Sequence, residues 1–105
     1  MSGLTHWIKL AREFYMPIIL GEKRFEVRKD DRIYRVGDYL EMTTVDADGS
    51  PLPNNAKRWV SAKITYRLQG GSYGIEDGYV VLGIQAFAYG SFNDDGTRGQ
   101  RDGGK

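Results

Sequence analysis

The chain of 105 residues is long enough for one compact domain and too short for two. It contains no cysteine, which excludes disulfide scaffolds, thiol nucleophiles and thiolate metal sites. With 15 Lys and Arg against 14 Asp and Glu, the net charge of +1 gives the chain no strong overall attraction to nucleic acid or to an anionic membrane. The first twenty residues carry neither a signal peptide nor an apolar run long enough to span a membrane. We therefore expect a cytoplasmic protein with no membrane association.

Hydrophobic periodicity predicts a strand and then a helix near the N-terminus. Residues 5–10 alternate as a strand does. An amphipathic pattern follows, in which Leu10, Phe14 and Ile18 repeat at helical spacing on the apolar face, and it ends at Gly21. Pro17 lies inside this pattern, lacks an N–H group and clashes with the preceding helical turn. We therefore expect a helix that is short, kinked or late to start.

The rest of the chain up to residue 87 indicates strands separated by turns. Residues 24–29 alternate, with Phe25 and Val27 on one face and Arg24, Glu26 and Arg28 on the other. Further strands are predicted at residues 39–45, 60–68 and 79–87, with loops at 46–55 and 70–74. The last of these strands is nearly all apolar, which is expected of a strand buried on both faces.

One helix and about five strands predict an α+β fold, namely a small mixed β-barrel of about five to six strands with one main helix after the first strand. We assign residues 1–87 to this single domain. Residues 88–105 are rich in Gly, Asp, Asn and Arg, a composition that predicts a disordered C-terminal tail without packed structure.

Metal and nucleophile chemistry lacks the residues it needs. His6 is the single histidine, so a zinc site would need three carboxylates around it, and no nucleophile-elbow sequence supports a Ser-His-Asp hydrolase. The glycines within 70–74 are not followed by Gly-Lys-Ser or Gly-Lys-Thr, so they indicate a turn rather than a phosphate-binding loop. We expect neither a metal nor a cofactor.

The segment from Gly21 to Arg28 carries the constellation that points to chemistry. Glu26 and Arg28 are i and i+2 neighbours on one strand face, and an arginine held by a carboxylate keeps its guanidinium aimed for bidentate contact with a phosphate or a base edge. Lys23 adds a mobile positive charge at the start of the strand. The alternative interpretation is a surface ladder of charges, which contributes little to stability.

The spacing Gly21-x-Lys23-x-x-Glu26-x-Arg28 resembles the G-x-K-x-x-E-x-R signature of ASCH domains in the PUA-like superfamily. More closely, the chain resembles the small bacterial and phage proteins of domain of unknown function 3850. The matching stretches lie at residues 6–10, at Phe14, and at residues 20–32, 34–38, 64–68 and 74–84.

This resemblance implies a pseudo-barrel in which the helix after the first strand borders a cleft for RNA or a nucleobase. Lys23, Glu26 and Arg28 match the positions that line the cleft. His6 and Lys9 match the opening strand of the family and are candidates for the same cleft, with a core or surface role as the alternative for His6.

The first functional hypothesis is an RNA- or nucleotide-binding module. Lys23, Arg28 and the basic residues of segment 57–67 would take phosphates of single-stranded RNA or of a nucleotide, while Trp59 or Tyr73 stacks an unpaired base. For Trp59 a core position is the alternative.

Two further hypotheses belong to other classes. Some ASCH-like proteins resemble amidohydrolases of acylated cytidine, in which the signature lysine activates a threonine. Glu26 occupies the place of that threonine, so Lys23 and Glu26 are the catalytic candidates for hydrolysis of a modified nucleoside or of RNA. The third hypothesis is a phage-type factor that binds a host protein.

Overall fold

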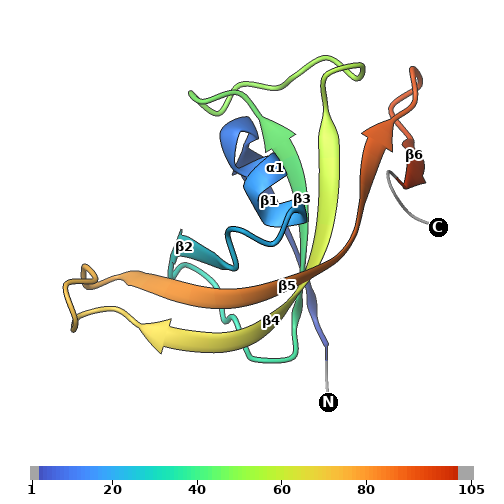
Figure 1. Cartoon of the computed structure of the whole chain (residues 1–105). Helices are drawn as coiled ribbons and strands as arrows, with labels where there is room; N and C mark the ends of the chain where they lie inside the picture. The colour runs from blue at the N-terminus through green and yellow to red at the C-terminus, as the bar shows by residue number, and fades with distance from the viewer. Residues whose placement is uncertain (1–2, 102–105) are drawn as a thin grey trace.

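The alternating segments of the sequence fold into one curved sheet in the computed structural model of the chain, which describes residues 3–101 (Figure 1). Within these residues the sheet has six strands: β1 (Thr5–Ala11), β2 (Phe25–Lys29), β3 (Tyr39–Val45), β4 (Arg58–Gln69), β5 (Tyr79–Phe92) and β6 (Arg98–Arg101). The predicted sheet-rich domain with one helical segment after the first strand is confirmed.

The strand order is β1-β3-β4-β5-β2, with β6 paired to β5. The β1–β3 pair is parallel and all other pairs are antiparallel. Strand β5 pairs with β4 over most of its length, with β2 along its first part and with β6 near its end. Register shifts along the β4–β5 ladder accompany the bend of these two long strands, which cross the molecule together in Figure 1.

The expectation of a closed β-barrel is wrong. The edge strands β1 and β2 do not pair with each other through their backbones, so the sheet stays open between them. The helical segment is inserted between these two strands in the chain, and β2 has only five residues. The two edges are instead linked by the side chain of Arg28 on β2, which donates to the carbonyl of Lys9 on β1.

The helical segment is short, as Pro17 predicted. A 3₁₀ turn, η1 (Arg12–Phe14), leads into α1 (Tyr15–Ile19). Ile18 is 2% exposed and Tyr15 is 6% exposed, and both belong to the core that α1 helps to cover. No helix within residues 3–101 is long and apolar enough to cross a membrane.

The core lies on one face of the curved sheet and under α1. It comprises Ile8, Leu10, Tyr15, Ile18, Tyr34, Leu40, Met42, Val60, Ala62, Ile64, Val80, Leu82 and Ile84. In β5 the fully buried residues alternate with partly exposed ones, so the expectation that this strand is buried on both faces is wrong. Its outward residues Tyr79, Val81 and Gly83 are partly covered, whereas Gln85 and Phe87 are exposed.

The expected tail without packed structure beyond residue 87 is also wrong over the part that the structure describes. Strand β5 continues to Phe92 and β6 pairs back onto it. In the turn between them, the N–H of Asn93 donates to the carbonyl of Thr97 and the N–H of Gly96 donates to the carbonyl of Asn93. The polar residues that indicated disorder therefore make a hairpin turn. Residues 102–105 of the expected tail lie outside the described residues.

Candidate functional site

A tight turn after α1 brings the chain back to the sheet and places Lys23. Gly21 has φ of 80°, in the left-handed region that glycine adopts without strain. The carbonyl of Pro17 accepts the N–H groups of Glu22 at 2.8 Å and of Lys23 at 3.0 Å. Because Pro17 lies in the first helical turn, its missing N–H costs no intrahelical hydrogen bond. Lys23 therefore stands at the entrance of β2, beside the helix.

Glu26 is the buried charge of β2, with 3% of its surface exposed. The predicted alternation is present, but the face that carries Glu26 turns inward, while Phe25 and Val27 are about half exposed. Lys23 Nζ lies 2.6 Å from Glu26 Oε2, and Arg28 Nη1 lies 3.2 Å from Glu26 Oε1. A buried carboxylate held by two cations differs from a solvent-exposed charge ladder, because its burial depends on both partners.

Lys23 is enclosed on several sides. Its Nζ donates to the carbonyl of Phe25 at 2.6 Å in addition to Glu26. The same nitrogen lies 4.8 Å from the ring centroids of Phe14 and Phe25, within the range of cation–π attraction. These contacts hold the ammonium group at a fixed point between two aromatic rings.

Arg28 reaches from β2 to β1 across the open edge of the sheet. Its Nη1 donates to the carbonyl of Lys9 at 3.0 Å and to Glu26 at 3.2 Å. Within residues 3–101, its Nε and Nη2 make no hydrogen bond. The guanidinium is thus oriented by two contacts on one nitrogen and keeps other N–H groups for a ligand.

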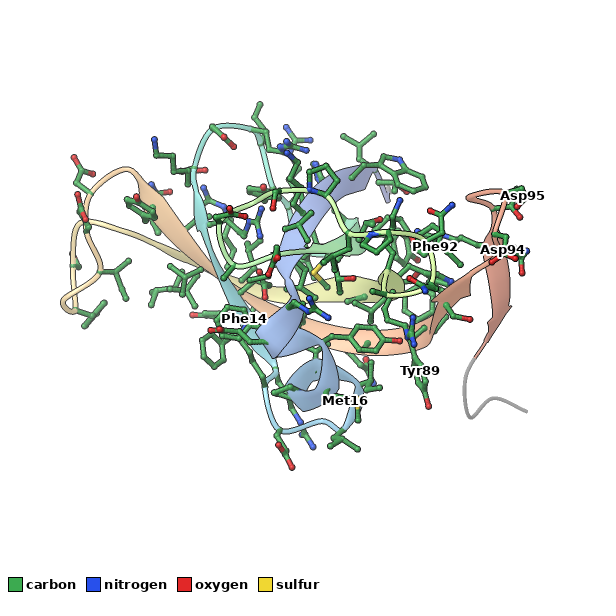
Figure 2. All side chains as sticks on the ribbon, turned by 90° about the horizontal axis from the view of Figure 1, so that it is seen from above. Phe14, Met16, Tyr89, Phe92, Asp94 and Asp95 are labelled. Atoms are coloured by element: carbon green, nitrogen blue, oxygen red, sulfur yellow. The ribbon has the colours of Figure 1, made fainter. Side chains whose placement is uncertain are left out.

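These three side chains border a pocket of about 410 Å³ between β1, the helical segment and β2. Its other lining residues are apolar: Leu10, Ala11, Phe14, Phe25 and Val27. Figure 2 shows Phe14 on the helical segment, far from Asp94 and Asp95 in the β5–β6 turn. We name this hollow, lined by these eight residues, the Glu26 pocket.

Sequence reasoning missed the two aromatic walls of the Glu26 pocket. Phe14 fell on the predicted core face of the helix, and Phe25 alternated with charged residues as a core residue does. The structure leaves them 36% and 46% exposed. One feature of the sequence could have indicated these walls: a helix that ends at a glycine directly before the charged strand brings the first helical residues close to the start of that strand.

The structure places His6 outside this pocket. His6 is buried, its Nε2 donates to Asp38 Oδ2 at 2.8 Å, and its ring centroid lies 4.9 Å from that of Tyr34. Burial opposes the ionisation of Asp38. However, hydrogen bonds from His6 and from the N–H groups of Arg35 and Leu4 outweigh this effect and hold the pKa of Asp38 below 3.8. Of the two roles considered for His6, its contacts match the core role.

Lys9 and Trp59 have different positions from those expected at a shared cleft. Lys9 contributes its carbonyl to Arg28 and lines a neighbouring hollow rather than the Glu26 pocket. Trp59 is 8% exposed and its Nε1 donates to the carbonyl of Ser91 at 3.0 Å. The guanidinium of Arg98 lies 4.3 Å from the Trp59 ring. A ring buried in this way offers no open face for stacking, so the core position matches the structure.

Other parts of the surface offer less specific chemistry. Within residues 3–101, no group of three or more His, Asp or Glu side chains is arranged to hold a metal ion. A larger hollow of about 670 Å³ lies over residues 30–36 and Arg67, but it has no buried carboxylate held by two cations. The other sequence candidate for stacking, Tyr73, is 86% exposed in the loop between β4 and β5 and does not line the Glu26 pocket.

Comparison with known proteins identifies a family. A family model described as "Domain of unknown function (DUF3850)" matches residues 5–84, from the start of β1 into β5. This range contains all eight residues of the Glu26 pocket and excludes β6. No curated protein matches the sequence significantly. Because the family model covers most of the chain, the protein belongs to the DUF3850 family.

Proposed function

We propose that this protein binds an unpaired nucleotide, either free or within RNA, in the Glu26 pocket. The observation that carries the proposal is the buried Glu26 carboxylate, which is held by two cations at the edge of an otherwise apolar pocket. A few fixed polar groups among apolar walls are typical of small-ligand sites. The G-x-K-x-x-E-x-R spacing and the helix beside the pocket support placing the protein among ASCH-like domains of the PUA-like superfamily. A cytoplasmic site of action accords with this ligand.

A nucleotide matches the pocket on two counts. The exposed parts of the Phe14 and Phe25 rings can stack on the flat faces of a base, as aromatic side chains do in single-strand recognition. Arg28 holds N–H groups that make no hydrogen bond within residues 3–101, and a guanidinium pairs with two acceptors of a base edge or a phosphate.

The contacts of Lys23 and Glu26 favour binding over hydrolysis. No hydroxyl, thiol or imidazole side chain lines the Glu26 pocket, so its described lining lacks the hydroxyl nucleophile that the amidohydrolase reaction uses. Lys23 Nζ is held by Glu26, by the carbonyl of Phe25 and by two aromatic rings. These contacts favour a role in which Lys23 orients Glu26 and the ligand. Hydrolysis of a modified nucleoside or RNA, and capture of a host protein, are therefore outcomes that the test distinguishes.

The test compares Phe25→Ala with Phe87→Ala. Both phenylalanines lie in strands, Phe25 in β2 and Phe87 in β5, and they are 46% and 52% exposed. Phe87 does not line the pocket. Calorimetry measures the affinity of each variant for the four ribonucleoside monophosphates and for six-residue oligoribonucleotides. We expect that Phe25→Ala binds the ligands of the wild type about 5- to 150-fold more weakly, the range for a lost stacking contact. Phe87→Ala should bind them like the wild type.

The controls separate the competing functions. Circular dichroism verifies that both variants are folded. Equal affinity of wild type and Phe25→Ala contradicts binding in this pocket, and no saturable binding to any of these probes rejects the proposed function. Chromatography of the titrated samples detects turnover, which would assign hydrolysis. A protein captured from lysate after ribonuclease treatment would indicate the interaction factor.

A further inference from the structure

A second hollow adjoins the Glu26 pocket at Arg28, which lines both. It also measures about 410 Å³ and is lined by Trp7, Ile8, Lys9, Arg28, Arg32, Glu41 and Thr43. The first pocket is bordered by the β1 residues Leu10 and Ala11, and the second by the three residues before them. We name the second hollow the Trp7 pocket.

Trp7 is an exposed tryptophan, in contrast to the buried Trp59. It is 66% exposed, because alternation along β1 buries the residues on either side of it and turns Trp7 and Lys9 outward. The Arg98 guanidinium lies 5.3 Å from the Trp7 ring centroid, and it also contacts Glu41 at 2.7 Å. Trp7 is therefore supported by Arg98 while most of its surface stays open to a ligand.

The charge of the Trp7 pocket favours a phosphate. Lys9, Arg28 and Arg32 contribute three cations, while Glu41 is the one acidic lining residue. Glu41 is already engaged by the hydroxyl of Ser61 at 2.7 Å and by Arg98. Arg32 makes a 3.8 Å ion pair with Asp31, but both side chains are substantially exposed, so this pair is easily exchanged for another anion.

We propose that the Glu26 pocket and the Trp7 pocket together bind one single-stranded nucleic acid segment. One base occupies the Glu26 pocket, the phosphate lies against Arg28, Lys9 and Arg32, and the adjacent base stacks on Trp7. Trp7 and Ala11 are four residues apart along β1, a distance of about 13 Å, which leaves room for two neighbouring bases. The inference rests on the proposed function and deepens it, because it makes the ligand a strand rather than a free nucleotide.

The test measures oligonucleotide and mononucleotide affinity for wild type, Trp7→Ala and Tyr66→Ala. Tyr66 is a matched control, since it is 65% exposed and lines neither pocket. The oligonucleotide probes are fluorescein-labelled hexauridylate, hexaadenylate and hexathymidylate. We expect Trp7→Ala to lower the affinity for the probe that the wild type binds by about 5- to 150-fold. Affinity for ribonucleoside monophosphates should be unchanged, and Trp7→Phe should restore part of the loss. The hexathymidylate arm distinguishes DNA from RNA.

Salt dependence provides a second readout that does not involve Trp7. Lys9→Ala and Arg32→Ala should each reduce the slope of log affinity against log salt by about 0.7, the value for one phosphate contact on a single strand. Lys63→Ala, an exposed lysine that lines neither pocket, should leave the slope unchanged.

The outcomes separate the two proposals. If Phe25→Ala weakens oligonucleotide binding while Trp7→Ala, Lys9→Ala and Arg32→Ala match their controls, the second subsite is refuted and the nucleotide site stands. If hexanucleotides bind no more tightly than the monophosphates, the strand is refuted in the same way. If the wild type binds neither kind of probe, both proposals fail.

Discussion

Glu26 is the residue on which the geometry of the site depends. Its carboxylate lies inside the protein, where an unpaired charge is strongly unfavourable, and Lys23 and Arg28 each neutralise one of its oxygens. In return, the carboxylate fixes both cations at the border of the pocket. Removing it should therefore alter stability as well as ligand binding.

We expect Glu26→Gln to lower the free energy of unfolding by about 1.5–3 kcal/mol, because the amide loses hydrogen bonds to charged groups and leaves two cations close together. Urea denaturation checks this value. Glu22→Gln is the matched control, since Glu22 is exposed and makes no ion pair within residues 3–101. Equal stability of the two variants would show that the buried pair does not contribute to the fold.

At the scale of elements, the β5–β6 hairpin connects the end of the chain to the sheet. Arg98 on β6 contacts Trp59, Trp7 and Glu41. These partners come from β4, β1 and β3, so one side chain joins four strands. The hairpin is therefore part of the folded structure that supports the Trp7 ring.

Truncation after Phe92, which removes β6, should lower the midpoint of thermal unfolding by about 5–15 °C. The loss of two cation–π contacts and an ion pair amounts to about 1–2 kcal/mol, and 1 kcal/mol corresponds to about 4–8 °C in a domain of this size. Differential scanning calorimetry measures the shift against a chain ending at Arg101, which retains β6. A midpoint that is the same for both chains would mean that β6 pairs without stabilising the sheet.

The elements that the sequence predicted well are those whose pattern has one interpretation. Strand β3 has the predicted bounds, and β1 extends only to Ala11, one residue beyond them. The inward orientation of Glu26 could not be predicted from alternation. An alternating pattern favours burial of the apolar face, but here nearby cations neutralise the charge of Glu26 and allow the other face to be buried. The loop predicted at 46–55 contains the turn signal Asp48-Gly49. Asp95-Gly96 is a turn signal of the same type, but the Gly-, Asp- and Arg-rich composition around it indicated disorder instead.

The candidate site shows the same division between pattern and packing. Its polar residues, Lys23, Glu26 and Arg28, were predicted and lie together. Its aromatic walls were not predicted, because exposure of Phe14 and Phe25 follows from an open sheet edge, and the sequence indicated a closed barrel.

At the scale of the whole molecule, Asp38 joins the N-terminal strand to the loop before β3. It accepts hydrogen bonds from His6, from the N–H of Leu4 and from the N–H of Arg35. Because these bonds lower its pKa in the folded state, Asp38 contributes stability above its unfolded pKa of about 3.8. This contribution is lost as the pH falls through the lower folded pKa.

We therefore expect Asp38→Asn to lose about 1–3 kcal/mol of stability at pH 6, the cost of weakening several bonds to a buried group. Below pH 4 the difference from wild type should shrink, because the wild-type carboxyl is then becoming protonated. Urea midpoints measured from pH 6 to pH 2 test this, with Asp31→Asn as a control, since its side chain is 63% exposed. A constant difference across this range would exclude Asp38 as a source of acid sensitivity.

The strand order gives the open edge a thermodynamic role. The two strands that border the Glu26 pocket are not backbone partners, and three other strands separate them in the sheet. Their relative position is therefore maintained by the complete fold, and a chain that has lost any of the intervening strands has no pocket. A ligand bound there binds only the fully folded state. At a ligand concentration 100 times the dissociation constant, binding would add about 2.7 kcal/mol to the free energy of unfolding of the whole sheet. Occupancy of the pocket would thus protect the protein from partial unfolding and from the proteolysis that follows it.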